Sequence, residues 1–504
     1  MNKLKILLIG ATLCYGVMPM GAAVKDTARV EHLSMWNMLT QEQRTNPALH
    51  GSAYHTSYSE MALNYDYQKQ SEAFVQEKGD GSSLGSLAIE SYLRMNVRTA
   101  VWGSASYTAG TQKNIRWNSS SDYELLQPYL MADAQGGDTH KERYTFSGGY
   151  ATQLGRWSLG GELAIRAEHE YRDRDPRMRG IVTDVSLGAG AAYDIGGYRW
   201  AAAVKGSIYK QTNSVDFYNE LGVIPEYHML GLGAEYARFS GEHANVSYRG
   251  GGIGVQLDAL PLGNQGVYAH VAMGRSGYER LLASDNSLPL SKLIYNKVNA
   301  TIGWKQDGKQ QWAAYGNFAF QKRSGDENIV GKSDSQYYPI LGKLTMYKDY
   351  LMDASLGGMY GRTSAKQHWM LSLKAGVRNH RERYVYPERK LNRAHAYAAL
   401  EGQWMRTLTE RFALLLNLGV QHYAKVSDDL VMPFANMEED FAAMMRHRYL
   451  FAKASYTDAQ LKVRGDYSLR KLPIGLFAEV NGGVVVCSES EHQLGMKVTL
   501  GVTF

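Results

Sequence analysis

Polar and apolar residues alternate with a period of two along most of the chain from about residue 59 onward. In residues 157–172, Trp157 and Leu163 fall on one face of an extended chain, whereas Glu162 and Arg166 fall on the other. Successive side chains of a β-strand point to opposite sides, so this pattern predicts strands. About 18 such segments follow one another without a helical crossover pattern, with a range of 16 to 20. The chain is therefore predicted to be all-β and antiparallel.

The connections between these segments alternate between short and long. This arrangement is typical of a transmembrane β-barrel with short periplasmic turns and long extracellular loops, and an even strand number puts both termini in the periplasm. The short connections fall at 154–156, 194–197, 307–309 and 407–409, and the long polar ones near 113–140, 213–245 and 425–445.

Seven tryptophans lie within a few residues of the predicted short turns: Trp102, Trp157, Trp200, Trp304, Trp312, Trp369 and Trp404. Tryptophan favours membrane interfaces, where its ring is apolar and its N–H stays wet, so these residues predict an aromatic girdle at the periplasmic interface. A three-residue hairpin loop at Asp307-Gly308-Lys309 would place Trp304 opposite Trp312. The next such turn would place Trp404 opposite Phe412.

The N-terminus has the features of a secretory signal peptide. Lys3 and Lys5 precede an apolar run, and small residues end at Ala23, which predicts a signal at residues 1–23. A lipoprotein interpretation would use Cys14, but the preceding leucine is too bulky. No later run approaches the roughly 20 apolar residues of a spanning helix, so any span is built from strands. We expect residues 24–58 to form a periplasmic segment or lumen plug, and residues 59–504 the barrel.

Composition adds limits on chemistry and partners. The net charge of +6, or +4 without Lys3 and Lys5, is too balanced to predict nucleic-acid binding. The 52 glycines and 35 tyrosines fit curved, close-packed sheet. Loss of Cys14 with the signal leaves Cys487 alone, which excludes a disulfide or a cysteine metal site within the mature chain. The glycine runs fall inside strand patterns, so they are not phosphate loops and we predict no cofactor.

The inward faces of the predicted strands carry charges of both signs, which need partners if they are buried. If residues 367–384 and 391–406 pair about a turn at Pro387-Glu388, Glu382 faces Arg393 and Lys374 faces Glu401. We therefore predict a polar lumen with charges that include Glu162, Arg166, Lys374, Glu382, Arg393 and Glu401.

The same register sets His380 beside His395. Adjacent imidazoles can share a divalent ion, or repel each other when protonated, so the pair is a candidate metal or pH-sensitive site near the external rim. The alternative, which we favour, is two solvated lumen histidines in a ladder of charges.

Some outer-membrane barrels are enzymes, so a nucleophile and base were sought near the rim. His169 clusters in sequence with Glu168, Glu170 and Asp173, yet its parity places it on the lipid face. We therefore predict that the protein is not an enzyme, with an embedded hydrolase as the alternative. Residues 434–445 have the composition of a short amphipathic helix over the external mouth, although a structured surface loop is the favoured interpretation.

The chain ends in a strictly alternating strand that closes on Phe504, and this ending resembles the signal recognised by the outer-membrane assembly machinery. Trp36 and Asn46-Pro47-Ala48 resemble the N-terminal region of fatty-acid-transporter-like barrels. Over nearly the whole chain, the length, the layout and the final strand resemble an uncharacterised family of Bacteroidota outer-membrane barrels (domain of unknown function 6850). That resemblance implies a location in the outer membrane but no activity.

The transporter resemblance implies a plug inside the lumen and an apolar substrate path, but the charged lumen argues against an apolar substrate. A TonB-dependent receptor is disfavoured because such receptors have a longer plug and about 22 strands. The sequence therefore predicts a passive or plugged channel for small polar solutes. The alternative is a non-transport anchor for a periplasmic or surface protein. The expected partners are outer-membrane lipid, the assembly machinery and that protein.

Overall fold

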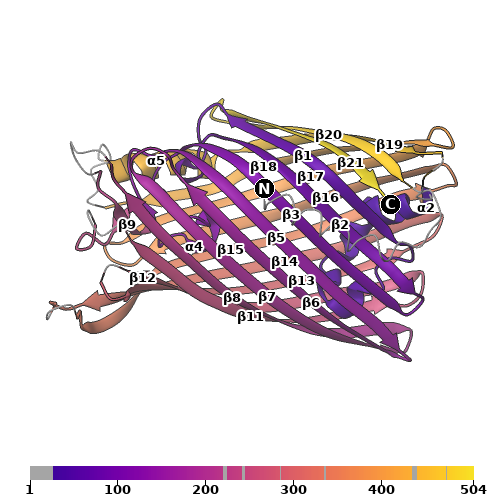
Figure 1. Cartoon of the computed structure of the whole chain (residues 1–504), viewed down its shortest axis with the longest axis horizontal. Helices are drawn as coiled ribbons and strands as arrows, with labels where there is room; N and C mark the ends of the chain where they lie inside the picture. The colour runs from indigo at the N-terminus through magenta and orange to yellow at the C-terminus, as the bar shows by residue number, and fades with distance from the viewer. Residues whose placement is uncertain are drawn as a thin grey trace, which may run out of the picture.

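The computed structural model describes residues 26–218, 224–240, 245–283, 285–333, 337–433, 440–470, 472 and 474–504, so the predicted signal peptide lies outside the described residues. Eighteen strands form one closed antiparallel barrel (Figure 1). Each wall strand pairs with the next wall strand along the chain, and β1 also pairs with β21 to close the ring. The predicted fold class and the strand number of about 18 are confirmed.

The strands of the wall are long enough to cross a membrane when tilted. They are β1 (Tyr58–Gln70), β2 (Gly81–Asn96), β3 (Thr99–Ile115), β5 (Gly137–Leu154), β6 (Trp157–Tyr171), β7 (Arg177–Ile195), β8 (Tyr198–Asp216), β11 (Val246–Pro261), β12 (Gln265–Leu282), β13 (Leu288–Gln306), β14 (Gln310–Val330), β15 (Ile340–Thr363), β16 (Gln367–Tyr384), β17 (Arg389–Thr407), β18 (Phe412–Val431), β19 (Tyr456–Ser468), β20 (Gly475–Cys487) and β21 (His492–Thr503).

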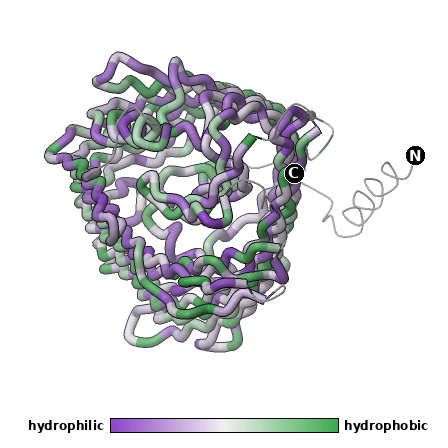
Figure 2. Tube along the Cα trace, turned by 90° about the vertical axis from the view of Figure 1, so that its left-hand side faces the viewer, coloured by the Kyte–Doolittle hydropathy of each residue, from purple (hydrophilic) through white to green (hydrophobic). Residues whose placement is uncertain are grey.

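The alternation along each strand sorts side chains between the two sides of the wall, and apolar and polar residues alternate along the wall in Figure 2. Leu163, Ile208 and Leu356 are exposed on the outer side. Glu168, on the same strand as Leu163, points inward and is buried. An outward apolar band facing lipid and an inward polar face are what a membrane barrel requires.

The predicted division into short turns and long loops is confirmed. The two-residue turn between β7 and β8 consists of Gly196 and Gly197, whose φ angles of 61° and 79° suit the turn that matches strand twist. It lies at the same end of the barrel as Tyr58 and Phe504. The long loops lie at the other end, which we take as extracellular.

The predicted hairpin registers are wrong by an even number of residues. Trp304 pairs with Ala314 rather than Trp312, although the two indole rings still meet diagonally at 4.1 Å. Trp404 pairs with Leu416 rather than Phe412. The real hairpin loops are longer than the predicted ones. Because the shift is even, each side chain keeps its predicted side of the wall.

Shorter elements occupy the two ends of the barrel. The N-terminal ones lie at the periplasmic end, and the others, including a three-stranded sheet of β4, β9 and β10, at the extracellular end (Figure 1). Among the described residues, no helix is long and apolar enough to cross a membrane. These elements are α2 (Asp26–Leu33), the 3₁₀ helices η2 (Met35–Thr40), η3 (Gln43–Thr45) and η4 (Gln76–Lys78), α3 (Pro47–His50), α4 (Tyr123–Leu126), β4 (Met131–Ala132), β9 (Tyr227–Gly231), β10 (Ala234–Glu235) and α5 (Asp440–Lys453).

Candidate functional site

The lumen of the barrel is occupied at both ends, and the cavities beside the segment at the periplasmic end are the candidate site. Residues 26–57, here named the plug, lie inside the periplasmic end. Residues 116–136, 227–240 and 440–453, here named the cap, lie inside the extracellular end. Seen along the barrel, chain crosses the interior of the ring (Figure 2).

The plug is anchored by an apolar contact around η2. Trp36 is buried in a cluster with Met35 and Leu39 of the plug and with Tyr268 and Met370 of the wall. Its indole Nε1 also donates a hydrogen bond to the carboxylate of Asp307, 3.2 Å away. This residue was singled out in the sequence only as part of a motif, and its partners come from strands more than 200 residues away.

The Asn46-Pro47-Ala48 step packs closely against the wall. Asn46 is completely buried, and its side chain caps α3 by accepting a hydrogen bond from the backbone N–H of Ala48 at 3.0 Å. The step packs on two glycines of the wall: a Cβ on Gly160 would lie 2.5 Å from the carbonyl carbon of Pro47, and one on Gly190 would meet the Asn46 side chain. Only glycine leaves room for the plug at these positions.

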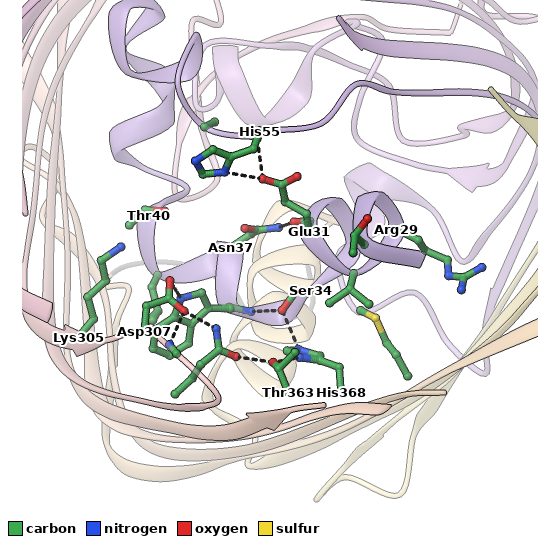
Figure 3. Close-up of a pocket in the computed structure, with 18 of the residues that line it drawn as sticks. Arg29, Glu31, Ser34, Asn37, Thr40, His55, Lys305, Asp307, Thr363 and His368 are labelled. Atoms are coloured by element: carbon green, nitrogen blue, oxygen red, sulfur yellow. Dashed lines mark hydrogen bonds and ion pairs between the residues drawn. The ribbon is translucent and has the colours of Figure 1, made fainter. Parts of the chain in front are cut away.

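Side-chain hydrogen bonds complete the docking of the plug. Gln403 accepts a bond from the backbone N–H of Met35 at 2.8 Å and donates one to a plug carbonyl. Ser34 lies 2.9 Å from the ring Nε2 of His368. Beside these contacts, a crevice of about 670 Å³ runs between the plug and the periplasmic turns, with Asp307 and Thr363 on its wall side (Figure 3). The boundary between plug and wall is therefore incomplete.

Glu31 and His50 set the electrostatics within the plug. Burial would raise the pKa of Glu31, but the Thr56 hydroxyl and the backbone N–H of His55 bind its carboxylate and lower that pKa overall. Burial lowers the pKa of His50 to about 4, and Arg44 adds to the effect. His50 is therefore a neutral imidazole at neutral pH, packed 4.5 Å from the indole ring of Trp102.

The cap is built more like a protein core. Two clusters of fully buried apolar side chains join its loops to the wall, and they hold Leu126, Met131, Leu232 and Met445 from the cap. Each of its three segments is tethered to wall strands on both sides. The favoured prediction of a surface loop at 434–445 is wrong for residues 440–445, which belong to α5; residues 434–439 lie outside the described residues.

Buried charges also connect the cap to the wall. Arg172 forms an ion pair with Asp133 at 2.9 Å, with both side chains almost fully buried. Ser119 donates hydrogen bonds to both Asp133 and Glu226. Burial and the nearby charge of Asp133 raise the pKa of Glu226 well above its ordinary value. The cap therefore depends on a charge network as well as on apolar packing.

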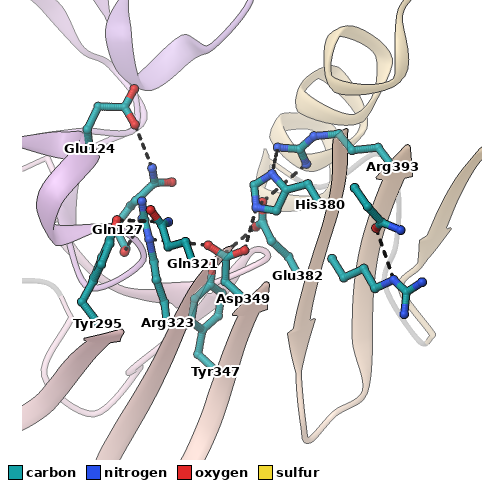
Figure 4. A network of polar contacts seen from close by, with 12 residues as sticks. Glu124, Gln127, Tyr295, Gln321, Arg323, Tyr347, Asp349, His380, Glu382 and Arg393 are labelled. Atoms are coloured by element: carbon teal, nitrogen blue, oxygen red, sulfur yellow. Dashed lines mark hydrogen bonds and ion pairs between the residues drawn. The ribbon is translucent and has the colours of Figure 1, made fainter. Parts of the chain in front are cut away.

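One ion-pair cluster holds helix α5 against β16 and β17. Arg448 of α5 donates to both carboxylate oxygens of Glu382, at 3.0 and 3.1 Å. Arg393 lies 3.5 Å from the same carboxylate. His380 lies 2.6 Å from Asp349 and connects Asp349 to Glu382 (Figure 4). Glu382 thus has the predicted partner Arg393, together with Arg448, which could not be expected from the pattern of residues along the chain.

The predicted register around this cluster is wrong by two residues. His380 pairs with Arg393, and His395 pairs with Arg378, because the hairpin has a four-residue loop at 385–388. His395 instead makes a 3.1 Å contact with the carbonyl of Ala454. Among the described residues, no group of three or more His, Cys, Asp or Glu side chains is placed to hold a metal ion.

Between the plug and the wall, two cavities of about 320 and 230 Å³ share Met38 and Glu401 in their linings. Lys374 lines the smaller cavity together with Glu401, although its cross-strand partner is Ala399 rather than Glu401. Asp458 and Lys462 line the larger cavity, and Lys462 also pairs with Glu479 at 3.1 Å. The cavities are thus lined by charges of both signs.

The remaining predicted site residues divide between lumen and lipid. Glu162 and Arg166 face the lumen, where Arg166 binds Asp122 of the cap at 2.6 Å. The sequence cluster around His169 is split by the wall: Glu168 and Glu170 point inward and are buried, whereas His169 points outward and accepts a hydrogen bond from Arg179 at 3.2 Å. Because of this split, the cluster does not bring a nucleophile and a base together.

The aromatic residues near the short turns lie mainly on the outer side. Trp157, Trp200 and Trp312 are exposed to the outside, and Trp369 pairs across strands with Trp404. Trp304 shares their side of the wall. The predicted girdle is wrong for Trp102. This side chain is only 8% exposed, and its Nε1 donates a hydrogen bond to Glu162 inside the lumen.

These features define a class of protein. A closed barrel of 18 antiparallel strands, apolar on the outside and charged on the inside, with outward-facing tryptophans at its short-turn end, is a multi-pass β-barrel of the bacterial outer membrane.

The chain belongs to a family of unknown function, DUF6850, whose profile matches residues 47–504. A search among curated proteins finds no match.

Similar solved structures include two receptors of Acinetobacter baumannii. The ferric preacinetobactin receptor BauA is 7% identical, with a TM-score of 0.40 over 90% of this chain and 80% of BauA. The siderophore receptor PiuA is also 7% identical, with a TM-score of 0.40 over 89% of this chain and 82% of PiuA. The ferric-catecholate import receptor Fiu of E. coli K12 is 6% identical, with a TM-score of 0.37 over 88% of this chain and 81% of Fiu. Likeness at this level carries no argument about function.

Proposed function

We propose that the protein is a plugged channel for small polar solutes, in which residues 26–57 are the part that moves. The observation that carries this proposal is the attachment of the plug. It joins the wall at one described end only, where β1 begins at Tyr58. If the signal is cleaved after Ala23, as the sequence predicts, the other end of the plug is free.

The size of the barrel supports a channel once the plug has left. Barrels of 16 to 18 strands enclose an aqueous lumen unless something fills it. Here the plug supplies much of the filling at the periplasmic end, and it does so with short helices rather than with side chains of the wall.

The lining of the lumen favours small polar solutes. Charges of both signs surround the two cavities, and they are carried by Glu401, Lys374, Asp458 and Lys462. Rings or clusters of charge set the selectivity of pores, and a mixed lining disfavours apolar solutes, which would strip water from these groups without replacing it. The resemblance to fatty-acid transporters therefore does not extend to the substrate.

Single-channel recording in planar bilayers tests the proposal. Four proteins would be compared: the wild type, a variant lacking residues 26–57, Arg448→Ala, which releases α5, and the combination of the two. We expect the wild type to stay mostly closed, the deletion to raise the conductance, and the combined variant to conduct best because both ends are then loosened. Arg446→Ala, on the exposed side of α5, is the matched control for Arg448→Ala.

A result without current in any of these proteins would overturn the channel, provided that each one runs as a folded barrel in unheated gels. That outcome would favour the other role, a membrane anchor, in which the crevice beside the plug serves a periplasmic protein.

A further inference from the structure

Five basic side chains gather on the outer face of β14–β17, away from the lumen. They share the outward side with Trp312, Tyr360 and Trp369 of the same strands, and the strand registers place them in two adjacent cross-strand rows. One row is Lys322, Tyr350, Arg381 and Asn392, and the other is Ser324, Lys348, Arg383 and Lys390.

These rows lie at the outer interface of the membrane. Ten residues separate Lys322 from Trp312, and ten separate Tyr350 from Tyr360. At about 3.3 Å per residue and a tilt of about 40°, this distance is about 25 Å along the barrel axis, which is the height of the apolar band of such barrels. With Trp312 at the periplasmic interface, the basic rows reach the headgroups of the outer leaflet.

A groove of about 580 Å³ runs through the cluster on the lipid-facing side. Arg381, Arg383 and Lys390 line its polar side. Phe320 and Met352 line its apolar side, and they form the next cross-strand row toward the middle of the membrane. The groove thus has a charged end at the headgroups and an apolar end at the acyl chains.

The positive charge of the cluster is mostly uncompensated by protein. Glu388 binds Arg383 at 3.0 Å and Lys390 at 2.8 Å. Lys322, Lys348 and Arg381 make no ion pair with any residue that the structure describes; Arg381 donates only to the amide oxygen of Asn379, at 3.3 Å.

Outward charges at the same height elsewhere on the wall are arranged differently. Lys210 lies ten residues from Trp200, and its cross-strand neighbour Arg249 binds Glu279 at 3.0 Å. That site thus has an acidic partner of the kind that Lys322, Lys348 and Arg381 lack.

We propose that this groove binds a phosphorylated glycolipid of the outer leaflet, of the lipid A class. Its phosphate groups lie against Arg381 in the groove and against Lys322 and Lys348, which flank the groove in the same two rows, and its acyl chains lie over Phe320 and Met352. Lysine and arginine form charge-assisted hydrogen bonds to phosphate, and the guanidinium of arginine can do so through two parallel bonds. A protein partner fits less well, because the groove continues into the apolar band that lipid covers.

Native mass spectrometry of the purified full-length barrel, titrated with diphosphorylated lipid A in detergent, tests this site. We expect the double variant Lys322→Gln/Arg381→Gln to bind lipid A at least ten-fold more weakly than the wild type. The matched control, Lys210→Gln/Arg249→Gln, removes one lysine and one arginine at the same height and should bind as the wild type does. Equal loss in both variants, or in neither, would overturn the proposal.

A second measurement does not depend on the variants folding. The wild type should bind lipid A from which both phosphates have been removed at least ten-fold more weakly than the phosphorylated form. Equal binding of the two forms would show that the acyl chains alone are recognised, and it would also overturn the proposal.

Discussion

The plug and the cap occupy the same barrel, but they are held in different ways. The plug is a single segment with one described attachment to the wall, docked by apolar clusters around Trp36 and Leu49 and by hydrogen bonds, among them those of Gln403 and the one from Asn46 to Asp258. The cap consists of three segments, each tethered on both sides, and is docked by two apolar clusters and by buried ion pairs such as Arg172 with Asp133.

This difference supports the proposal that the plug is the end that moves. Removing one partner of a buried ion pair leaves an uncompensated charge, whereas the plug can leave with its hydrogen bonds replaced by water. The apolar packing of the cap is more extensive, whereas the plug adds a shape-matched contact with two glycines of the wall. Hydrogen exchange followed by mass spectrometry resolves the two regions separately, so the effect of each substitution can be measured in both the plug and the cap.

The largest expected effect is at the cap. Arg448→Ala leaves Glu382 buried with weaker partners, and losing one member of such a pair costs about 3–5 kcal/mol. Exchange across residues 440–453 should therefore become much faster, while exchange across residues 26–57 stays unchanged. Arg446→Ala should change neither region, and a response of both ends to Arg448→Ala would show that the two ends are coupled.

At the plug, Trp36→Ala should have the next largest effect. It removes the central side chain of the apolar anchor and the bond to Asp307, at a cost of about 3 kcal/mol. Exchange should rise across residues 26–57 and not in the cap. Met38→Ala is the control, because that side chain is 52% exposed in the lumen. Similar effects of the two substitutions would contradict the role of Trp36 as the anchor.

Gly160→Ala tests the shape match without touching the plug itself. The added Cβ would meet Pro47 at 2.5 Å, and relieving such an overlap costs about 1–3 kcal/mol. The plug should exchange faster, and the conductance should rise slightly. Gly206→Ala on the neighbouring part of the wall has nothing within 4 Å of its new Cβ and should be silent. If hydrogen exchange in the plug is unchanged in Gly160→Ala, the wall rather than the plug shifts to make room for the added Cβ.

The smallest expected effect is that of pH. Between pH 6.5 and about 4, the undocked plug takes up a proton at His50 that the docked plug does not, so docking weakens as the pH falls.

In the cap, the raised pKa of Glu226 and the lowered pKa of Asp122 act in opposite directions. Exchange corrected for its intrinsic pH dependence should therefore rise more in the plug than in the cap between pH 7 and pH 5. A plug that is tighter at pH 5 would contradict this interpretation.

The sequence predicted the wall well because each side chain there obeys a local rule. Alternation alone tells which side Leu163 or Glu162 faces, whatever the neighbouring strand does. It does not determine which residue stands opposite, and for that reason the registers at Trp304 and His380 are wrong by two residues. Trp102 was assigned to the girdle because it lies near a short turn, although its position in the alternation of β3 predicts a side chain that points inward.

The plug and the cap could not be derived in the same way, because their contacts join residues far apart in the sequence. Arg448 lies 66 residues from Glu382, and nothing in the loop between β18 and β19 indicates that pair. Gly160 and Gly190 carried a readable signal, since glycine within a strand often marks the close approach of another backbone. That signal showed that something would approach, but not that it would be Asn46 and Pro47.

The pairing of β1 with β21 has a consequence for how the molecule is made. Every other neighbour in the wall follows in sequence, whereas this seam joins Glu60 to Thr503 and ends with Phe504 bonded to Ser59. The first strand synthesised must therefore wait for the last, with two open edges exposed meanwhile. Assembly is then a ring-closing event at the end of biogenesis, and a chain shortened by its final strand would have nothing with which to close.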